Sequence, residues 1–228
     1  MFCVTTFHTG EPYLSAAMLL KESCEKQGVT CLIKEVAPLP PDQPPRIRFG
    51  KPIPTKPGIH KFPNELWHTK GRIVIEAMGE TGLPVWWVDA DALLVDGETL
   101  KKDTEMMLKN KVDFGCHYFL STNRKFSDVR YQGRLRWPSG GALFFNHTPA
   151  AKQLIVNWNE MHKQFPDEDD QMTIGRAMKA TVYLSLLTLP IGYHQQFDDP
   201  HGEGLTPVFK QMQIRRNQKY IKEQQDGR

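Results

Sequence analysis

The stretch that decides the fold is Leu83-Pro84-Val85-Trp86-Trp87-Val88-Asp89-Ala90-Asp91-Ala92. Its apolar run predicts a buried strand, and two carboxylates then follow where burying them unpaired would be costly. In an extended backbone alternate side chains share a face, so we expect Asp89 and Asp91 to converge on one hard cation while Ala90 points into the packing. Carboxylate oxygens suit Mg²⁺ or Mn²⁺. An Asp-x-Asp is also common as a simple turn former, and that alternative stays open here.

The residues before this strand predict a βαβ unit. Phe2 to His8 has the pattern of a strand, Gly10 to Gln27 that of a helix closed by Gly28, and Thr30 to Val36 that of a second strand. Such a unit implies a parallel sheet with a right-handed crossover.

A proline-rich segment separates this unit from the central strand. Nine of the 17 prolines lie between residues 38 and 63, which excludes a helix or a central strand and indicates a long surface loop. Asn64 can then cap a helix that reaches about Gly82.

The second half of the chain continues the alternation of helices and strands. Two glycines, Gly140 and Gly141, permit close backbone approach to a ligand before an apolar strand begins, although a tight turn without a ligand is the alternative. The expected elements are a helix over 97–110, a strand over 112–118, a polar loop through 137, helices over 148–163 and 167–178, and a late buried strand over 181–189. We therefore expect an α/β fold, Rossmann-like, with a mostly parallel central sheet flanked by helices.

Length and composition favour one soluble domain. The chain has 228 residues, 39% hydrophobic and 24% charged, with no apolar run long enough to span a bilayer. The first ten residues show no basic and apolar leader, and the four cysteines have no metal-type spacing, so we expect a reducing, cytoplasmic location.

These parts, in this order, resemble the GT-A family of nucleotide-diphospho-sugar glycosyltransferases over about residues 2–189. The resemblance rests on the strand opening at Thr5-Thr6, the Asp89-x-Asp91 pair, the Ser139-Gly140-Gly141-Ala142 segment and the acidic run Asp167-Glu168-Asp169-Asp170-Gln171. It implies a single GT-A-like domain in which the Asp89 and Asp91 carboxylates hold Mn²⁺ or Mg²⁺ against the donor diphosphate, which is expected to be UDP-linked, as in UDP-glucose.

The resemblance also implies roles for further residues. Thr5, Thr6 and Phe7 match the positions that cradle the nucleotide base, although they are also ordinary strand residues. Lys70 matches a basic residue aimed at the nucleotide or phosphate; a solvated lysine is the alternative. Ala90 would lie with its two neighbours in the donor site.

The acidic run is expected to lie against the sugar and the acceptor. Asp169, Asp170 and Gln171 are the catalytic candidates, and helix N-terminal acidity is the competing interpretation. One carboxylate could deprotonate an acceptor hydroxyl in an inverting reaction or steady an oxocarbenium-like sugar in a retaining one. The Asp170-Gln171 pair resembles that of retaining members of the family, which favours retention.

A third metal ligand is expected from the C-terminal part of the chain. Many members of the family supply a C-terminal histidine, which makes His201 the first candidate and His194 the second. Asp198, Asp199 or no ligand from this loop are the alternatives, since the fuller C-terminal signature of some subfamilies is absent.

Basic residues concentrate in three segments. Residues 46–61, 119–137 and 210–222 carry net charges of +5, +4 and +5, against −11 on the rest of a chain whose total is +3. Such asymmetry suits a polyanion, and the middle segment interleaves aromatic residues with its arginines, as in nucleic-acid binding. The expected acceptor-binding residues are Arg124, Arg130, Arg134, Arg136 and Trp137.

DNA is therefore a candidate acceptor, and enzymes of bacteriophage type in the family glycosylate hydroxymethylated pyrimidines. A small-molecule or protein acceptor is the alternative. A haloacid-dehalogenase-like phosphatase, with the first Asp as nucleophile, and a catalytically silent nucleic-acid-binding domain are the competing functions. Within one domain we expect a nucleotide-sugar half (1–118), an acceptor and catalytic half (119–208) and a basic tail (209–228).

Overall fold

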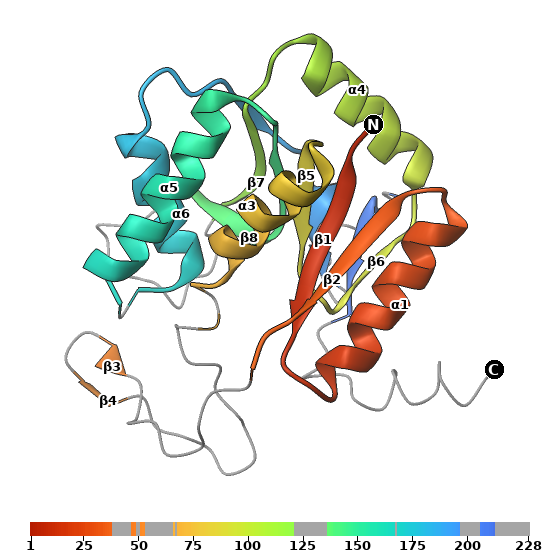
Figure 1. Cartoon of the computed structure of the whole chain (residues 1–228), viewed down its shortest axis with the longest axis horizontal. Coiled ribbons are helices and arrows are strands. Elements are labelled where there is room, and N and C mark those ends of the chain that lie inside the picture. Colours follow the sequence, from red (N-terminus) through yellow and green to blue (C-terminus); the bar gives the residue numbers. More distant parts are fainter. Residues whose placement is uncertain are drawn as a thin grey trace.

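The computed structural model describes residues 1–37, 47–48, 51–52, 66, 68–120, 136–166, 168–196 and 206–212. Their core is a six-stranded sheet in the order β2-β1-β5-β8-β7-β9. The strands are β1 (Cys3–His8), β2 (Thr30–Glu35), β5 (Val85–Val88), β7 (Phe114–Leu120), β8 (Arg136–Phe145) and β9 (Leu186–Thr188). β8 is antiparallel to both of its neighbours, and the other pairings are parallel. The expected α/β fold with a mostly parallel sheet is confirmed (Figure 1).

The central position of β5 follows from its sequence. All four residues of Val85–Val88 are buried, because helices and a second sheet cover both faces of the strand. Val85 and Trp87 point into one half of the core, whereas Trp86 and Val88 point into the other. The Trp86 ring stacks on Tyr193 with 5.0 Å between ring centroids, and its Nε1 donates to Thr104 Oγ1 (3.0 Å). The strand that leads into the acidic pair is thus packed on both sides.

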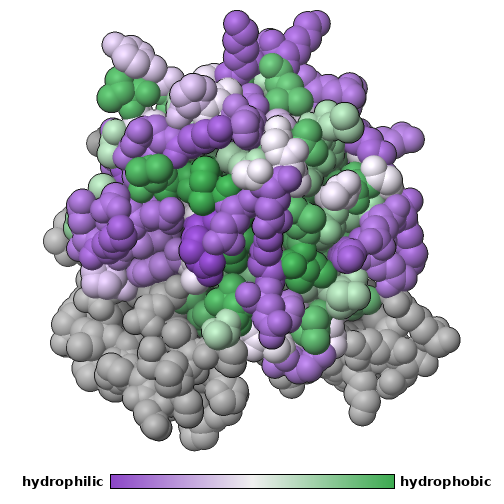
Figure 2. All heavy atoms as spheres, in the orientation of Figure 1, coloured by the Kyte–Doolittle hydropathy of each residue, from purple (hydrophilic) through white to green (hydrophobic). Residues whose placement is uncertain are grey.

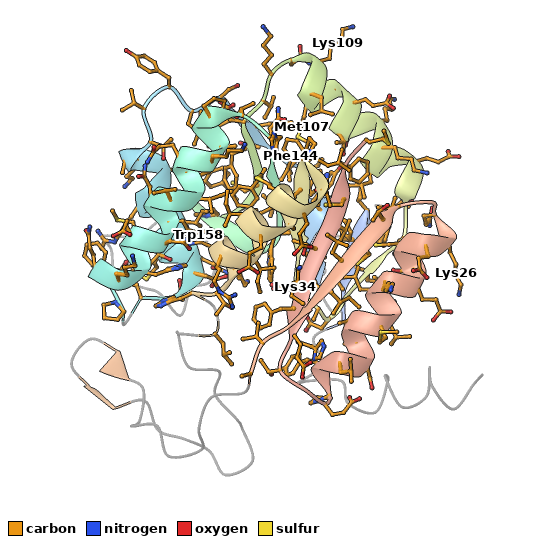
Figure 3. The ribbon with its side chains drawn as sticks, in the orientation of Figure 1. Lys26, Lys34, Met107, Lys109, Phe144 and Trp158 are labelled. Carbon is orange, nitrogen blue, oxygen red and sulfur yellow. The ribbon has the colours of Figure 1, made fainter. Side chains whose placement is uncertain are left out.

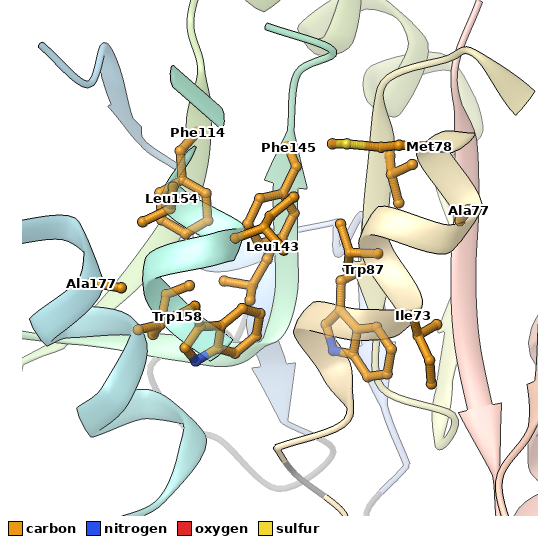
Figure 4. Close-up of a cluster of buried hydrophobic side chains, with 14 of the residues drawn as sticks. Ile73, Ala77, Met78, Trp87, Phe114, Leu143, Phe145, Leu154, Trp158 and Ala177 are labelled. Carbon is orange, nitrogen blue, oxygen red and sulfur yellow. The ribbon is translucent and has the colours of Figure 1, made fainter. Parts of the chain in front are cut away.

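Three helices cover one face of the sheet. They are α3 (Lys70–Thr81), α5 (Pro149–Gln164) and α6 (Asp170–Ala180). Figure 4 shows their apolar side chains, among them Ile73 and Trp158, gathered with Trp87 and Phe145 from the strands. α3 is followed by the C-cap residue Gly82, whose φ of 65° and N–H bond to the Met78 carbonyl form a left-handed cap.

The opposite face is covered by α1 (Tyr13–Lys26), α4 (Gly97–Lys109), the 3-10 helix η2 (Ile191–His194) and a small sheet. That sheet has the order β10 (Gln195–Gln196), β11 (Phe209–Gln211) and β6 (Ala92–Leu94). In Figure 3, Met107 and Phe144 lie between the layers, whereas Lys26 and Lys109 lie at the outer ends of their helices. Hydrophilic side chains cover much of the described face in Figure 2. Along the described residues, no helix combines the length and the apolar character needed to cross a membrane.

Several predicted elements differ from the structure. Gly140 and Gly141 lie inside β8 rather than in a loop before it. The predicted buried strand over 181–189 is shorter, and β9 lies at the sheet edge with Leu186 exposed. β6 follows the acidic pair and was not predicted. In the proline-rich segment, the described pairs β3 (Ile47–Arg48) and β4 (Lys51–Pro52) form a separate two-stranded sheet; the proposed cap Asn64 lies outside the described residues.

Candidate active site

The acidic pair lies on a turn at the carboxyl end of β5. The strand ends at Val88, and the Ala92 N–H donates to the Asp89 carbonyl (3.1 Å), which closes a turn over Asp89–Ala92. The prediction of an extended backbone at Asp89 and Asp91 is therefore wrong, because the chain turns here before it enters β6. Ala90 is buried, as expected, and both aspartates are partly exposed. A turn, like a strand, places these two carboxylates at one edge of the sheet.

Lys70 connects this turn to the start of α6. Its Nζ lies 2.8 Å from Asp89 Oδ1 and 2.7 Å from Asp170 Oδ2, and it donates to the Gly140 carbonyl at 3.1 Å. The side chains of Lys70 and Asp170 are 6% and 9% exposed, against 35% for Asp89. The ammonium also lies 5.2 Å from the centroid of the Trp87 ring. Lys70 is thus a buried cation shared by two carboxylates, and the alternative of a solvated lysine does not hold.

The charge of Lys70 is maintained by its partners. Burial alone would lower the pKa of the ammonium, but the carboxylates of Asp170 and Asp89 reverse that effect and raise the pKa above its ordinary value. Lys70 therefore stays protonated at neutral pH and supplies a fixed positive charge beside the turn.

The two glycines of β8 present their carbonyls to the same centre. The Gly140 carbonyl accepts from Lys70 Nζ and from Trp87 Nε1 (3.2 Å), and the Gly141 carbonyl accepts from the Asp89 N–H (2.9 Å). A Cβ on Gly140 would lie 2.5 Å from Asp170 Oδ2, so only glycine lets α6 approach this closely. The Gly141 N–H donates to Ser139 Oγ (3.2 Å).

The acidic run before α6 divides its residues among different contacts. Asp169 is the N-cap of α6 and accepts from the Met172 N–H (2.9 Å), whereas Glu168 forms a two-point ion pair with Arg176. Asp170 alone of the described acids in this run reaches Lys70. Gln171 follows it on the first turn of α6 and lies next to Gly140. Asp167 is outside the described residues.

The end of β1 lies beside β5 at the same edge of the sheet. Thr5 and Thr6 are fully buried, and Thr5 Oγ1 donates to the Leu32 carbonyl (3.3 Å). Phe7 is partly exposed, and its ring centroid lies 5.6 Å from that of Trp87. Of these three residues, only Phe7 therefore presents its side chain to the surface.

Several predicted site residues cannot be placed. His201, Asp198, Asp199, Arg124, Arg130 and Arg134 lie outside the described residues, and the side chains of His194, Arg136 and Trp137 are not described. Within the described ranges, no group of three or more His, Cys, Asp or Glu side chains is arranged to hold a metal ion. The Asp89–Asp91 turn is a two-carboxylate site as far as the described residues go.

Two further residues of the site were not singled out in the sequence. Trp87 Nε1 donates to Asp89 Oδ1 (3.2 Å), and Gln211 Nε2 donates to the Gly141 carbonyl (3.3 Å). The spacing of two residues on a strand could have connected Trp87 to Asp89. Nothing local in the sequence connects Gln211 to a turn 120 residues earlier.

Several solved structures have a fold similar to that of this chain. A glycosyltransferase involved in the glycosylation of the major capsid of PBCV-1 superposes with a TM-score of 0.67 at 11% identity, over 97% of this chain and 98% of the other. The galactosyltransferase LgtC, in complex with donor and acceptor sugar analogs, gives a TM-score of 0.53 at 13% identity, over 92% and 86%. The glycosyltransferase GlyE of Streptococcus pneumoniae TIGR4 gives 0.51 at 11% identity, over 92% and 54%.

These likenesses show that the chain has the fold of GT-A-type glycosyltransferases. No protein-family model matches the sequence, and no curated protein matches it. At such low identity the likeness concerns the fold alone.

Proposed function

We propose that this protein is a metal-dependent glycosyltransferase that moves a sugar from a nucleotide-diphosphate donor, UDP-linked, to an acceptor hydroxyl. The observation that carries the proposal is the Asp89–Asp91 turn at the carboxyl end of β5, connected through Lys70 to Asp170. Ligands of parallel α/β sheets bind outside the carboxyl ends of the strands, which is where this cluster lies.

The donor atoms of the turn fit a hard divalent ion. Lys70 and Trp87 both contact Oδ1 of Asp89, and the side chain is still about one-third exposed. We assign Asp89 Oδ2 and the Asp91 carboxylate as the oxygens that would hold Mn²⁺ or Mg²⁺. The ion would stabilise the negative charge that grows on the nucleotide diphosphate as the sugar leaves. His201 remains our proposal for a third ligand.

The remaining residues of the site bind and orient the substrates. Phe7 is the residue of β1 whose side chain can lie against the nucleotide base, with the backbone of Thr5 and Thr6 behind it. Lys70 holds the Asp170 carboxylate in place at the start of α6 through their ion pair. Asp170 and Gln171 would then face the sugar. Asp169 contributes by fixing the first turn of that helix. We propose a retaining transfer, because the Asp170-Gln171 pair is the feature shared with retaining members of the family.

The acceptor is proposed from charge. The basic segments 46–61, 119–137 and 210–222 suit a polyanion, and a hydroxymethylated pyrimidine in DNA would present both a phosphate backbone and a hydroxyl. Arg124, Arg130, Arg134, Arg136 and Trp137 are the residues we propose for DNA contact. Access to a base within a duplex would require it to be flipped out.

A screen of nucleotide sugars tests the proposal. The purified protein is incubated with UDP-, GDP- and ADP-linked sugars and Mn²⁺, first alone and then with DNA that contains or lacks 5-hydroxymethylcytosine. We expect Mn²⁺-dependent release of UDP, faster with the modified DNA, and a product whose anomeric configuration matches the donor by NMR. Release of phosphate from a simple phosphomonoester, without use of any nucleotide sugar, would instead establish the phosphatase alternative.

A further inference from the structure

The strand β11 lies next to the turn that carries Asp89 and Asp91, and is hydrogen-bonded to it. β11 pairs antiparallel with β6, with Phe209 opposite Leu94 and Gln211 opposite Ala92. The pairing continues past the end of β11, because the Met212 N–H donates to the Asp91 carbonyl at 2.6 Å. The backbone of the turn is therefore bonded directly to Met212, which follows Asp91 by 121 residues.

Gln211 adds a side-chain bond on the other side of the turn. It is buried, and its Nε2 donates to the Gly141 carbonyl at 3.3 Å. The same carbonyl accepts the Asp89 N–H at 2.9 Å. The Gly141 carbonyl oxygen thus accepts hydrogen bonds both from the backbone of Asp89, the first residue of the turn, and from the side chain of Gln211 on β11.

These bonds fix the two ends of the turn relative to each other. Asp89 is held through Gly141, and Asp91 is held through Met212, the neighbour of Gln211. A metal site needs its ligand oxygens held within about 0.5 Å of their working positions, and groups behind the ligands provide that precision. A three-residue strand such as β6 would leave the turn free to move if β11 were not bonded to it.

We propose that Gln211 is a positioning residue of the Asp89–Asp91 metal site, and that β11 is part of the binding apparatus rather than a peripheral strand. This inference rests on the proposed function, since it needs the turn to bind a divalent ion. Gln211 touches neither the ion nor the donor; it acts through the Gly141 carbonyl and the register of β11 against β6.

The test compares two variants that each lose one buried amide donor to a backbone carbonyl. Gln211→Met keeps the length of the side chain and removes the bond to Gly141. Asn146→Leu removes the bond from Asn146 Nδ2 to the Val112 carbonyl (2.8 Å), and also the bond that the His147 N–H donates to Asn146 Oδ1 (2.8 Å), at the opposite end of these strands. Binding of Mn²⁺ in the presence of UDP is measured for each from the electron paramagnetic resonance signal of free Mn²⁺, and the melting temperature of each is recorded.

We expect Gln211→Met to raise the apparent Kd for Mn²⁺ by about tenfold, the lower end of the effect of groups behind metal ligands. Asn146→Leu should melt earlier with an unchanged Kd. If Gln211→Met lowers the melting temperature but binds Mn²⁺ as the wild type does, Gln211 is only structural and the inference is overturned while the proposed function stands. If the wild type itself binds no Mn²⁺ with UDP, both are overturned. Should Gln211→Met not fold, Gln211→Asn, whose shorter amide falls short of Gly141, is measured against the same two outcomes.

Discussion

Lys70 and Asp170 form a buried ion pair, with 2.7 Å between Nζ and Oδ2, that joins the first residue of α3 to the first residue of α6. The same ammonium contacts Asp89 at the end of β5, so one cation holds the proposed metal turn and the proposed sugar-binding helix together. Separate parts of the sequence meet at this single charge.

Removing that cation should destabilise the protein strongly. Lys70→Met leaves the buried Asp170 carboxylate without its partner, and breaking a buried pair in this way costs about 3–5 kcal/mol of unfolding free energy. Urea unfolding followed by circular dichroism measures the loss. Lys70→Met combined with Asp170→Leu removes both charges and should recover at least half of it. A double variant no more stable than Lys70→Met would contradict the pairing.

Gly140 should not tolerate a side chain. In Gly140→Ala the new Cβ would lie 2.5 Å from Asp170 Oδ2 and would push α6 away from Lys70. We expect a loss of about 1–3 kcal/mol from overpacking and a larger relative loss of turnover. Gly79→Ala is the control, because Gly79 lies within α3 with nothing within 4 Å of its Cβ position; it should stabilise the protein by about 0.8–1 kcal/mol. Equal stability of the two variants would show that the close approach at Gly140 is unimportant.

His162 should make the protein sensitive to acid. Its ring is buried and lies between Trp158 and His68. Burial, with His68 nearby, lowers its pKa to about 3 from an ordinary value near 6.5. The unfolded chain then takes up a proton that the folded chain does not, so stability falls as the pH decreases from about 6.5 towards 3.

The measurement is the slope of unfolding free energy against pH between about 6 and 4. One proton contributes up to about 1.4 kcal/mol per pH unit, and His162→Phe, which keeps a ring to stack on His68, should reduce the slope by that amount. An unchanged slope would mean that His162 can be protonated in the folded state.

The sequence was sufficient to predict the order of the helices and strands of the main sheet, and the place of the acidic pair after the strand Val85–Val88, but not β6, β10 and β11. Strand and helix periodicity are local properties, and the buried Trp86 and Trp87 indicate a strand covered on both faces. The geometry of the Asp89–Ala92 turn was not predictable from the sequence, because the turn leads into β6, and β6 pairs with β11, more than 100 residues later in the chain. Local pattern carries no information about such a distant partner.

Within the site, the sequence likewise indicated which residues take part but not which contacts they make. Lys70 could be singled out from the resemblance, but its burial and its bond to Asp170 depend on how α3 and α6 pack. The acidic run seemed to be one cluster, yet Asp169 caps α6, Glu168 pairs with Arg176 and Asp170 turns inward to Lys70. Neighbouring carboxylates point in different directions because the chain changes from an extended conformation to a helix at Asp169, and the sequence alone does not fix where that change occurs.

Asp91→Ala should separate folding from activity. Asp91 is partly exposed on the turn, and its backbone bond to Met212 does not need the side chain, so the circular dichroism spectrum and the melting temperature should change little. Turnover of a nucleotide sugar with Mn²⁺ should fall by at least about 100-fold, since a proposed metal ligand is lost. Unchanged turnover would show that Asp91 is not a ligand of the metal ion.

The most direct measurement of the central claim is the affinity for UDP by isothermal titration calorimetry, in Mn²⁺ and again in EDTA, for the wild type and for Asp89→Asn with Asp91→Asn. If the turn holds a divalent ion against the donor diphosphate, the wild type should bind UDP at least about tenfold more tightly with Mn²⁺, and the double variant should lose this difference. Equal affinity of the wild type in Mn²⁺ and in EDTA would contradict the account.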